Sequence, residues 1–211
     1  MKVKDPISAL THLIGAVLAC IAAATLIIKA IEVGSMTYLI TFTIFGLSLI
    51  LLYTASTVYH IIDQPESLRR KYKRIDHMMI FVLIAGTYTP ICLISLKGTL
   101  GVTLLVIIWG IAIAGIIMKA FWLDAPRWLT TGMYLLMGWL VIVAIYPVFK
   151  AMPQEGFRWL VAGGITYTIG GIIYGLKWPL KHRKWFGFHE LFHLFVMGGS
   201  ACHYVLMMGY V

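Results

Sequence analysis

The residues best suited to chemistry in this sequence are a few histidines and acids set within apolar stretches, where ionisable groups are costly and usually functional. His189 and His193 are four residues apart, so they share one face of a helix. Three neutral imidazoles with an open fourth position form the usual catalytic zinc arrangement, in which bound water has a pKa of about 7. If the fold brings His60 to this pair, the three histidines predict a zinc site, with Asp76 as a general base.

Two of these positions need a closer look. Ser56 lies four residues before His60 on the same helix face, where its hydroxyl could hydrogen-bond a ligand, a carbonyl or an oxyanion. Asp76 also has a simpler interpretation as a helix cap, because Asp favours helix N-termini. A lone membrane histidine is most often bonded to a neighbouring helix. The metal site is therefore predicted from the whole set of His60, Asp76, His189 and His193, which lie at one depth in the membrane if the chain has the topology that its basic residues predict.

Other histidines are weaker candidates. His12 lies near the start of the first apolar stretch and ranks below the three proposed ligands. His203 is ten residues beyond His193, about 15 Å along a helix axis, so it cannot join the same metal ion. A hydrogen bond within the helix bundle is its expected role.

The segment from His189 to His193 also matches the H-E-x-x-H pattern, in which a metalloprotease uses the glutamate as its base. No downstream acidic ligand motif accompanies it. Glu190 has an alternative role as a negative charge at a helix N-terminus. An intramembrane protease is therefore the third-ranked interpretation.

Composition identifies the elements that must position these residues. Hydrophobic residues make up 61% of the 211 and charged residues 12%, with a mean hydropathy of +0.91. A soluble domain carries about twice that charged fraction. Continuous apolar runs of about 20 residues indicate transmembrane helices rather than a barrel. The predicted fold is a single all-α domain over residues 1–211 with spans at 8–29, 37–62, 76–96, 100–121, 129–149, 158–178 and 188–210.

Basic residues predict the orientation, because Lys and Arg accumulate in cytoplasmic loops. With the N-terminus inside and the C-terminus outside, only Lys29, Lys97, Lys150 and Arg158 of the 17 basic residues lie outside. The inner side then holds Lys2, Lys4, Arg69, Arg70, Lys71, Lys73, Arg74, Lys119, Arg127, Lys177, Lys181, Arg183 and Lys184. The net charge of +9 is thus explained by a membrane protein with lipid partners and basic cytoplasmic loops, and not by nucleic-acid binding.

This topology gives the candidate residues a common depth. His60 ends an outside-to-inside span, Asp76 begins the next span, and His189 and His193 begin the last one. All four lie at the predicted cytoplasmic end. The glycines of the sixth span, in contrast, favour close helix packing rather than a ligand role.

At these residues the sequence resembles the hemolysin III family, the bacterial branch of the progestin and adipoQ receptor family. The matching features are Ser56-Thr57-Val58-Tyr59-His60, Asp76 after a basic segment, His189-x-x-x-His193 in the last span, and the opening Thr11-His12 with Gly15. The resemblance covers essentially the whole chain. It implies zinc held by His60, His189 and His193, with a water bridging to Asp76.

The resemblance leaves several functions open. Ser56 matches the serine of a wider pattern shared with alkaline ceramidases, which implies hydrolysis of a lipid amide or ester at the cytoplasmic leaflet. The family name instead implies a cytolysin or pore-former, and a regulator of membrane lipids with structural zinc belongs to the same non-enzymatic class. Hydrolase is the first expectation and the non-enzymatic class is the alternative.

The predicted topology can be tested with reporters. A reporter fused after Val211 should be extracytoplasmic, and one inserted near Lys71 should be cytoplasmic, because the basic residues hold their loops inside. The measurement is the activity of compartment-specific reporter enzymes. Two reporters on the same side would mean a miscounted span, with the short turn at Lys97-Gly98 the first suspect.

Overall fold

The computed structural model describes residues 3–63, 65–180 and 186–211, and this part of the chain contains helices and no strand. The basic residues Lys2, Lys181, Arg183 and Lys184 lie outside it. The helices are α1 (Pro6–Val33), α2 (Met36–Ile61), α3 (Glu66–Pro90), α4 (Gly98–Phe121), α5 (Arg127–Trp139), α6 (Ile145–Ala151), α7 (Gln154–Leu176) and α8 (Phe188–Tyr210), with a π-helical segment η1 (Ile91–Leu96) and a 3₁₀ segment η2 (Leu140–Ala144).

Seven helical segments within this part are long and apolar enough to cross a membrane, since η1 continues α3 and η2 joins α5 to α6. The expectation of an all-α, seven-span membrane protein is confirmed. In a bacterium such a multi-pass protein lies in the plasma membrane. The inside-to-outside orientation stays a prediction.

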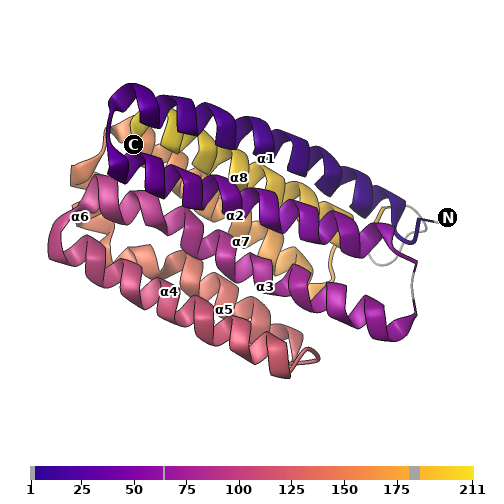
Figure 1. Ribbon diagram of the computed structural model, residues 1–211. Coiled ribbons are helices and arrows are strands. Elements are labelled where there is room, and N and C mark those ends of the chain that lie inside the picture. Colours follow the sequence, from indigo (N-terminus) through magenta and orange to yellow (C-terminus); the bar gives the residue numbers. More distant parts are fainter. Residues whose placement is uncertain (1–2, 64, 181–185) are drawn as a thin grey trace.

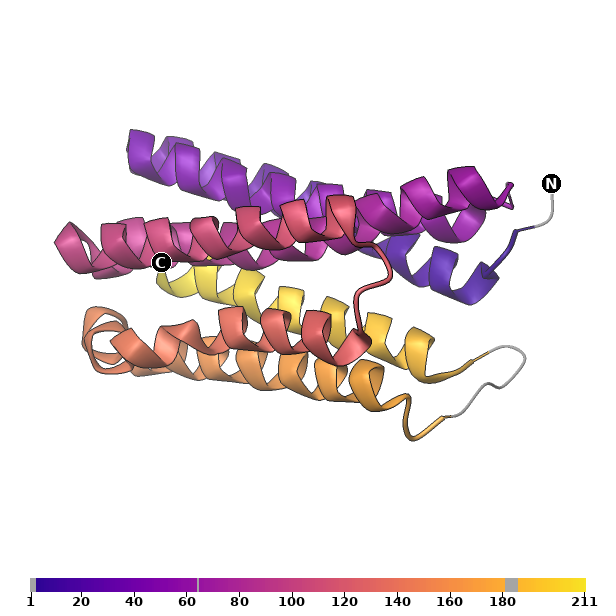
Figure 2. The same cartoon turned by 90° about the horizontal axis from the view of Figure 1, so that it is seen from below.

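The spans form a ring. Each span packs on the next along the chain, and α8 returns to contact α1, which also packs closely on α2 (Figures 1 and 2). The two termini lie at opposite ends of the bundle, as an odd number of spans requires (Figure 1). The end where α1 begins, α2 ends and α8 begins is called the histidine end below.

The third span begins earlier than expected. It was predicted to start at residue 76, but α3 begins at Glu66, so the basic residues from Arg69 to Arg74 are helical rather than in a loop. Lys and Arg are good helix formers, and Glu66 complements the N-terminal dipole. Asp76 consequently lies ten residues inside α3, which excludes the interpretation of Asp76 as a helix cap.

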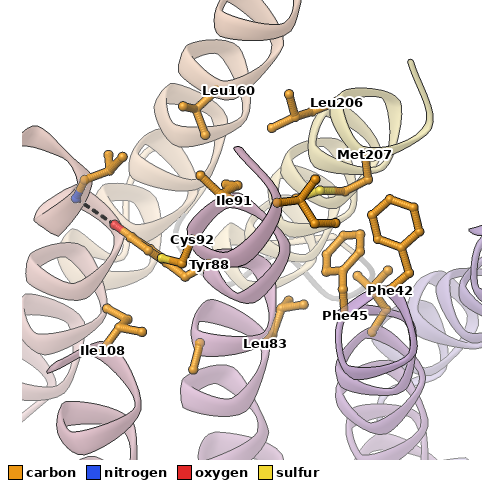
Figure 3. Close-up of a cluster of buried hydrophobic side chains, with 14 of the residues drawn as sticks. Phe42, Phe45, Leu83, Tyr88, Ile91, Cys92, Ile108, Leu160, Leu206 and Met207 are labelled. Carbon is orange, nitrogen blue, oxygen red and sulfur yellow. Dashed lines mark hydrogen bonds between the residues drawn. The ribbon is translucent and has the colours of Figure 1, made fainter. Parts of the chain in front are cut away.

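Large apolar side chains fill the bundle away from the histidine end (Figure 3). Phe42 and Phe45 of α2 face Leu206 and Met207 of α8, and all four are at most 2% exposed. Since α2 begins and α8 ends here, the opposite half of the bundle is solidly packed.

The fifth span is interrupted where α5 gives way to η2. A break in a membrane helix frees backbone groups that need other partners. The Tyr88 hydroxyl accepts a hydrogen bond from the Val141 N–H at 2.8 Å (Figure 3) and lies 2.9 Å from the carbonyl oxygens of Met137 and Gly138. The Tyr88 side chain of α3 thus provides a hydrogen-bond partner for backbone groups at the break in the fifth span.

Glycines let neighbouring helices approach closely at several contacts, as predicted for the glycines of the sixth span. A Cβ built on Gly163 of α7 would lie 2.3 Å from the His203 ring of α8. Gly115 of α4 presents the same situation, with the Phe81 ring of α3 at 2.3 Å. Phe81 is completely buried, so the ring has little room to move away.

Gly115→Ala should therefore destabilise the protein by about 1–3 kcal/mol, the usual cost of overpacking. Gly110→Ala is the matched control in the same helix, because a Cβ there meets no atom within 4 Å. The measurement is thermal unfolding of both variants in lipid nanodiscs. Equal unfolding temperatures for the two variants would contradict the close α3–α4 contact.

Candidate metal centre

Three histidines meet at the histidine end. His60 lies in the last turn of α2, and His189 and His193 lie in the first two turns of α8. One ring nitrogen from each lies within 4.8 Å of the others. Within the part of the chain that the structure describes, this is the one group of three or more His, Cys, Asp or Glu side chains close enough to hold a metal ion. We call these three residues the histidine cluster.

The hydrogen bonds of His60 determine which nitrogen faces the cluster. Its Nδ1 lies 3.1 Å from Asp5 Oδ2, and a carboxylate can only accept a hydrogen bond. The Nδ1 of His60 therefore carries the proton, which leaves Nε2 with a free lone pair. The hydrogen bond with His60, helped by the nearby Lys4, lowers the pKa of the Asp5 carboxyl to about 2.

The separation of these nitrogens suits a metal ion. His60 Nε2 lies 3.2 Å from His189 Nε2. A tetrahedral zinc ion with Zn–N bonds of 2.0–2.1 Å separates its nitrogen ligands by about 3.4 Å. His193 is the third member, with its ring centroid 4.5 Å from that of His189 and 5.1 Å from that of His60. Three imidazoles at this spacing fit zinc by both donor type and geometry.

The two predicted catalytic residues lie nearby but outside this close group. Asp76 and Ser56 are both buried and line one cavity together with His189 and His193. The Ser56 hydroxyl makes no hydrogen bond within the described residues, although it lies beside the Asp76 carboxylate. Asp76 is thus suited to contact a molecule next to the cluster rather than to be a direct ligand.

The cavity has a volume of about 140 Å³ and extends from the histidine cluster to His203. Its lining is mostly apolar. Three of its lining side chains, His12, Ser56 and Thr131, have buried polar atoms without a hydrogen-bond partner in the described structure. Buried polar groups normally have partners, so this cavity is a place for water or a ligand with polar atoms.

His12 is closer to the cluster than its low rank in the sequence suggested. Its ring stacks on that of His193, with centroids 3.5 Å apart and an interplanar angle of 15°. Helix α1 packs beside α8, a contact that linear sequence does not reveal. His203 instead has the expected hydrogen bond within the bundle, between Nδ1 and the Gly199 carbonyl at 2.8 Å.

Glu190 has a structural role at the beginning of α8. Its Oε2 accepts a hydrogen bond from the Gly187 N–H at 2.7 Å, and its Oε1 accepts one from the Ser8 hydroxyl at 2.6 Å. These contacts agree with the prediction that Glu190 is a negative charge at the N-terminus of a helix, rather than the base of a metalloprotease. Both carboxylate oxygens are occupied by these contacts, which connect α8 to α1.

Asp5 and Ser8 were missed in the sequence, and Thr11 was noted only as part of the family resemblance, although all three contact residues of the H-E-x-x-H segment or His60. One signal was present. A histidine that binds a metal usually donates its other N–H to an oxygen, often a carboxylate. Asp5 precedes the first span at the end where His60 was expected, which made it a candidate for that partner.

Comparison with known proteins identifies the family of this chain. The sequence profile described as "Haemolysin-III related" matches residues 1–204. This chain belongs to the haemolysin III family. The match includes every residue of the histidine cluster and both predicted catalytic residues.

The family relationship is supported by individual relatives. "Hemolysin-3" of Bacillus cereus is 44% identical over 99% of this chain and 93% of its own length. "Hemolysin-3 homolog" of Bacillus subtilis (strain 168) is 44% identical over 99% of this chain and 95% of its own length. The human "Monocyte to macrophage differentiation factor" is 27% identical over 82% of this chain and 71% of its own length. This last similarity links the chain to the progestin and adipoQ receptor family.

Proposed function

We propose that this haemolysin III protein binds one zinc ion at His60, His189 and His193 and hydrolyses an amide or ester bond of a membrane lipid from the cytoplasmic leaflet. The observation that carries the proposal is the position of the histidine cluster beside a cavity that also contains Asp76 and Ser56. The proposed metal ligands, the Asp76 carboxylate and the Ser56 hydroxyl would then all act on a molecule in the same cavity.

Each residue has a role in such a reaction. A zinc ion at the cluster would supply Lewis acidity and an acidified water. Asp76 would accept a proton from the attacking water as general base and return it to the leaving group. The Ser56 hydroxyl would donate a hydrogen bond to the oxygen of the reacting carbonyl. The apolar walls of the cavity would exclude bulk water and strengthen these electrostatic contacts.

The size of the cavity supports a specific mode of binding. A cavity of about 150 Å³ in another protein accepts a molecule the size of benzene. The 140 Å³ here suits a reacting amide or ester group with a short piece of its chain, not an entire lipid. The rest of the substrate would remain among the surrounding lipids.

The alternative is a cytolysin, or a regulator of membrane lipids in which zinc is structural. The name "Hemolysin-3" of the Bacillus cereus relative favours lysis. A structural zinc site usually has four protein ligands, whereas three side chains form the group described here. An open fourth position favours catalysis. A protease that uses Glu190 as its base is disfavoured by the two hydrogen bonds that occupy its carboxylate.

The first prediction from this proposal concerns metal content. Purified protein should contain about one zinc ion per chain, and the double variant His189→Ala/His193→Ala should contain none, because a single imidazole cannot retain the metal. His203→Ala removes a buried histidine of the same helix outside the cluster and should retain zinc. Elemental analysis makes the measurement. Stoichiometric zinc in the double variant would exclude this ligand set.

The second prediction concerns the transfer of a proton from the attacking water to Asp76. Asp76→Asn should keep its zinc but lose about 10²–10⁴-fold in turnover, because an amide cannot accept the proton. Glu190→Gln should retain turnover, since that carboxylate contacts Gly187 and Ser8 rather than the reaction. The measurement is lipid mass spectrometry of membranes that contain each variant, with zinc determined in the same samples.

The outcomes separate the candidate functions. A protease would give the opposite ranking, with Glu190 essential and Asp76 tolerant. A non-enzymatic protein would leave every lipid product unchanged in both variants. Identical lipid profiles for the unaltered protein and Asp76→Asn, across a broad set of amides and esters, would remove the main support for hydrolysis.

A further inference from the structure

Residues 5–11 lie along one side of the histidine cluster. Asp5 contacts His60 of α2, Ser8 contacts Glu190 at the start of α8, and Thr11 contacts His193. Asp5 and His60 are joined twice, because the Asp5 N–H also donates to the His60 carbonyl at 3.1 Å. One short segment therefore connects the two helices that carry the histidines.

The contact with His193 has a defined direction. The Thr11 hydroxyl has a single proton, and it donates that proton to the Ser8 carbonyl at 3.0 Å. Its 3.4 Å contact with His193 Nδ1 then requires the ring N–H to be the donor. His193 consequently has its proton on Nδ1 and a free lone pair on Nε2. Asp5 imposes the same tautomer on His60.

We propose that Asp5 and Thr11 are positioning residues of the metal centre: they hold His60 and His193 in the tautomer that directs each Nε2 toward the ion. The inference rests on the proposed zinc site but is independent of the reaction. In other metal sites, an oxygen partner of this kind fixes the ring orientation and raises the basicity of the ligand, and its removal typically weakens metal binding about 10–100-fold.

The test measures zinc affinity by competition with a chelator, on full-length protein in lipid nanodiscs. Asp5→Ala and Thr11→Val should each bind zinc more weakly, by about 10–100-fold for Asp5→Ala. Thr11→Ser should restore affinity because it keeps the hydroxyl. Asp5→Asn should be intermediate, because it keeps an acceptor oxygen but loses the charge. Asp124→Ala is the matched control, since it removes a carboxylate paired with Arg70 away from the cluster.

Two further readouts separate positioning from general stability. The visible spectrum of bound Co²⁺ should change in Asp5→Ala and Thr11→Val but not in Asp124→Ala, because the spectrum reports ligand geometry. Unfolding of the metal-free protein should differ little between Thr11→Val and Thr11→Ser. If Asp5→Ala does not fold, the two Thr11 variants and Asp5→Asn still test the proposal.

Failure of this inference is distinct from failure of the zinc site. Zinc bound to Asp5→Ala and Thr11→Val with unaltered affinity and spectrum would overturn the positioning role and leave the ligand set intact. Equal affinity losses in Thr11→Val and Thr11→Ser would also overturn it, because the hydroxyl would not matter. Absence of zinc from the unaltered protein would instead refute the proposed function itself.

Discussion

The constraint on which the histidine end depends is the need of the buried imidazoles of His60 and His193 for hydrogen-bond partners. Three histidine rings lie close together at the end of an apolar bundle, where an unpaired polar atom is costly. Asp5 provides a partner on the outer side of His60, and Thr11 does so for His193. On the inner side the nitrogens face one another, 3.2 Å apart for His60 and His189. A cation bound between them would remove the repulsion of their lone pairs.

The packing of the bundle differs between its two ends. Toward the opposite end, aromatic and aliphatic side chains fill the interior, and Tyr88 satisfies the broken fifth span. Toward the histidine end, the interior retains a cavity whose lining includes polar atoms without partners. A solid half holds the helices at fixed spacing, so the hollow half can keep its shape. The glycine contacts, such as Gly163 against His203, set that spacing.

Much of this arrangement was predictable from the sequence, because hydropathy and charge directly report the bilayer. Seven spans, their approximate bounds and the common depth of His60, Asp76, His189 and His193 follow from these patterns. The start of α3 did not follow, since a basic helix that extends from the apolar core resembles a loop in hydropathy. The closeness of His12 could not be predicted, because it depends on which helices are neighbours in the ring. For Asp5 the sequence offered a single signal, its position before the first span at the end where His60 was expected.

Because α8 packs on α1, the histidine cluster can form only late in the synthesis of the chain. The bond between Ser8 and Glu190 joins residues 182 positions apart, and His60 and His189 are separated by 129 positions. Chains grow at about 5–20 residues per second, so roughly 6–26 s pass between the synthesis of these two histidines. During that interval the nascent protein has His60 without its cluster partners. Metal binding at the proposed site would therefore be a last step of biogenesis, possible only after the final helix has entered the membrane and closed the ring.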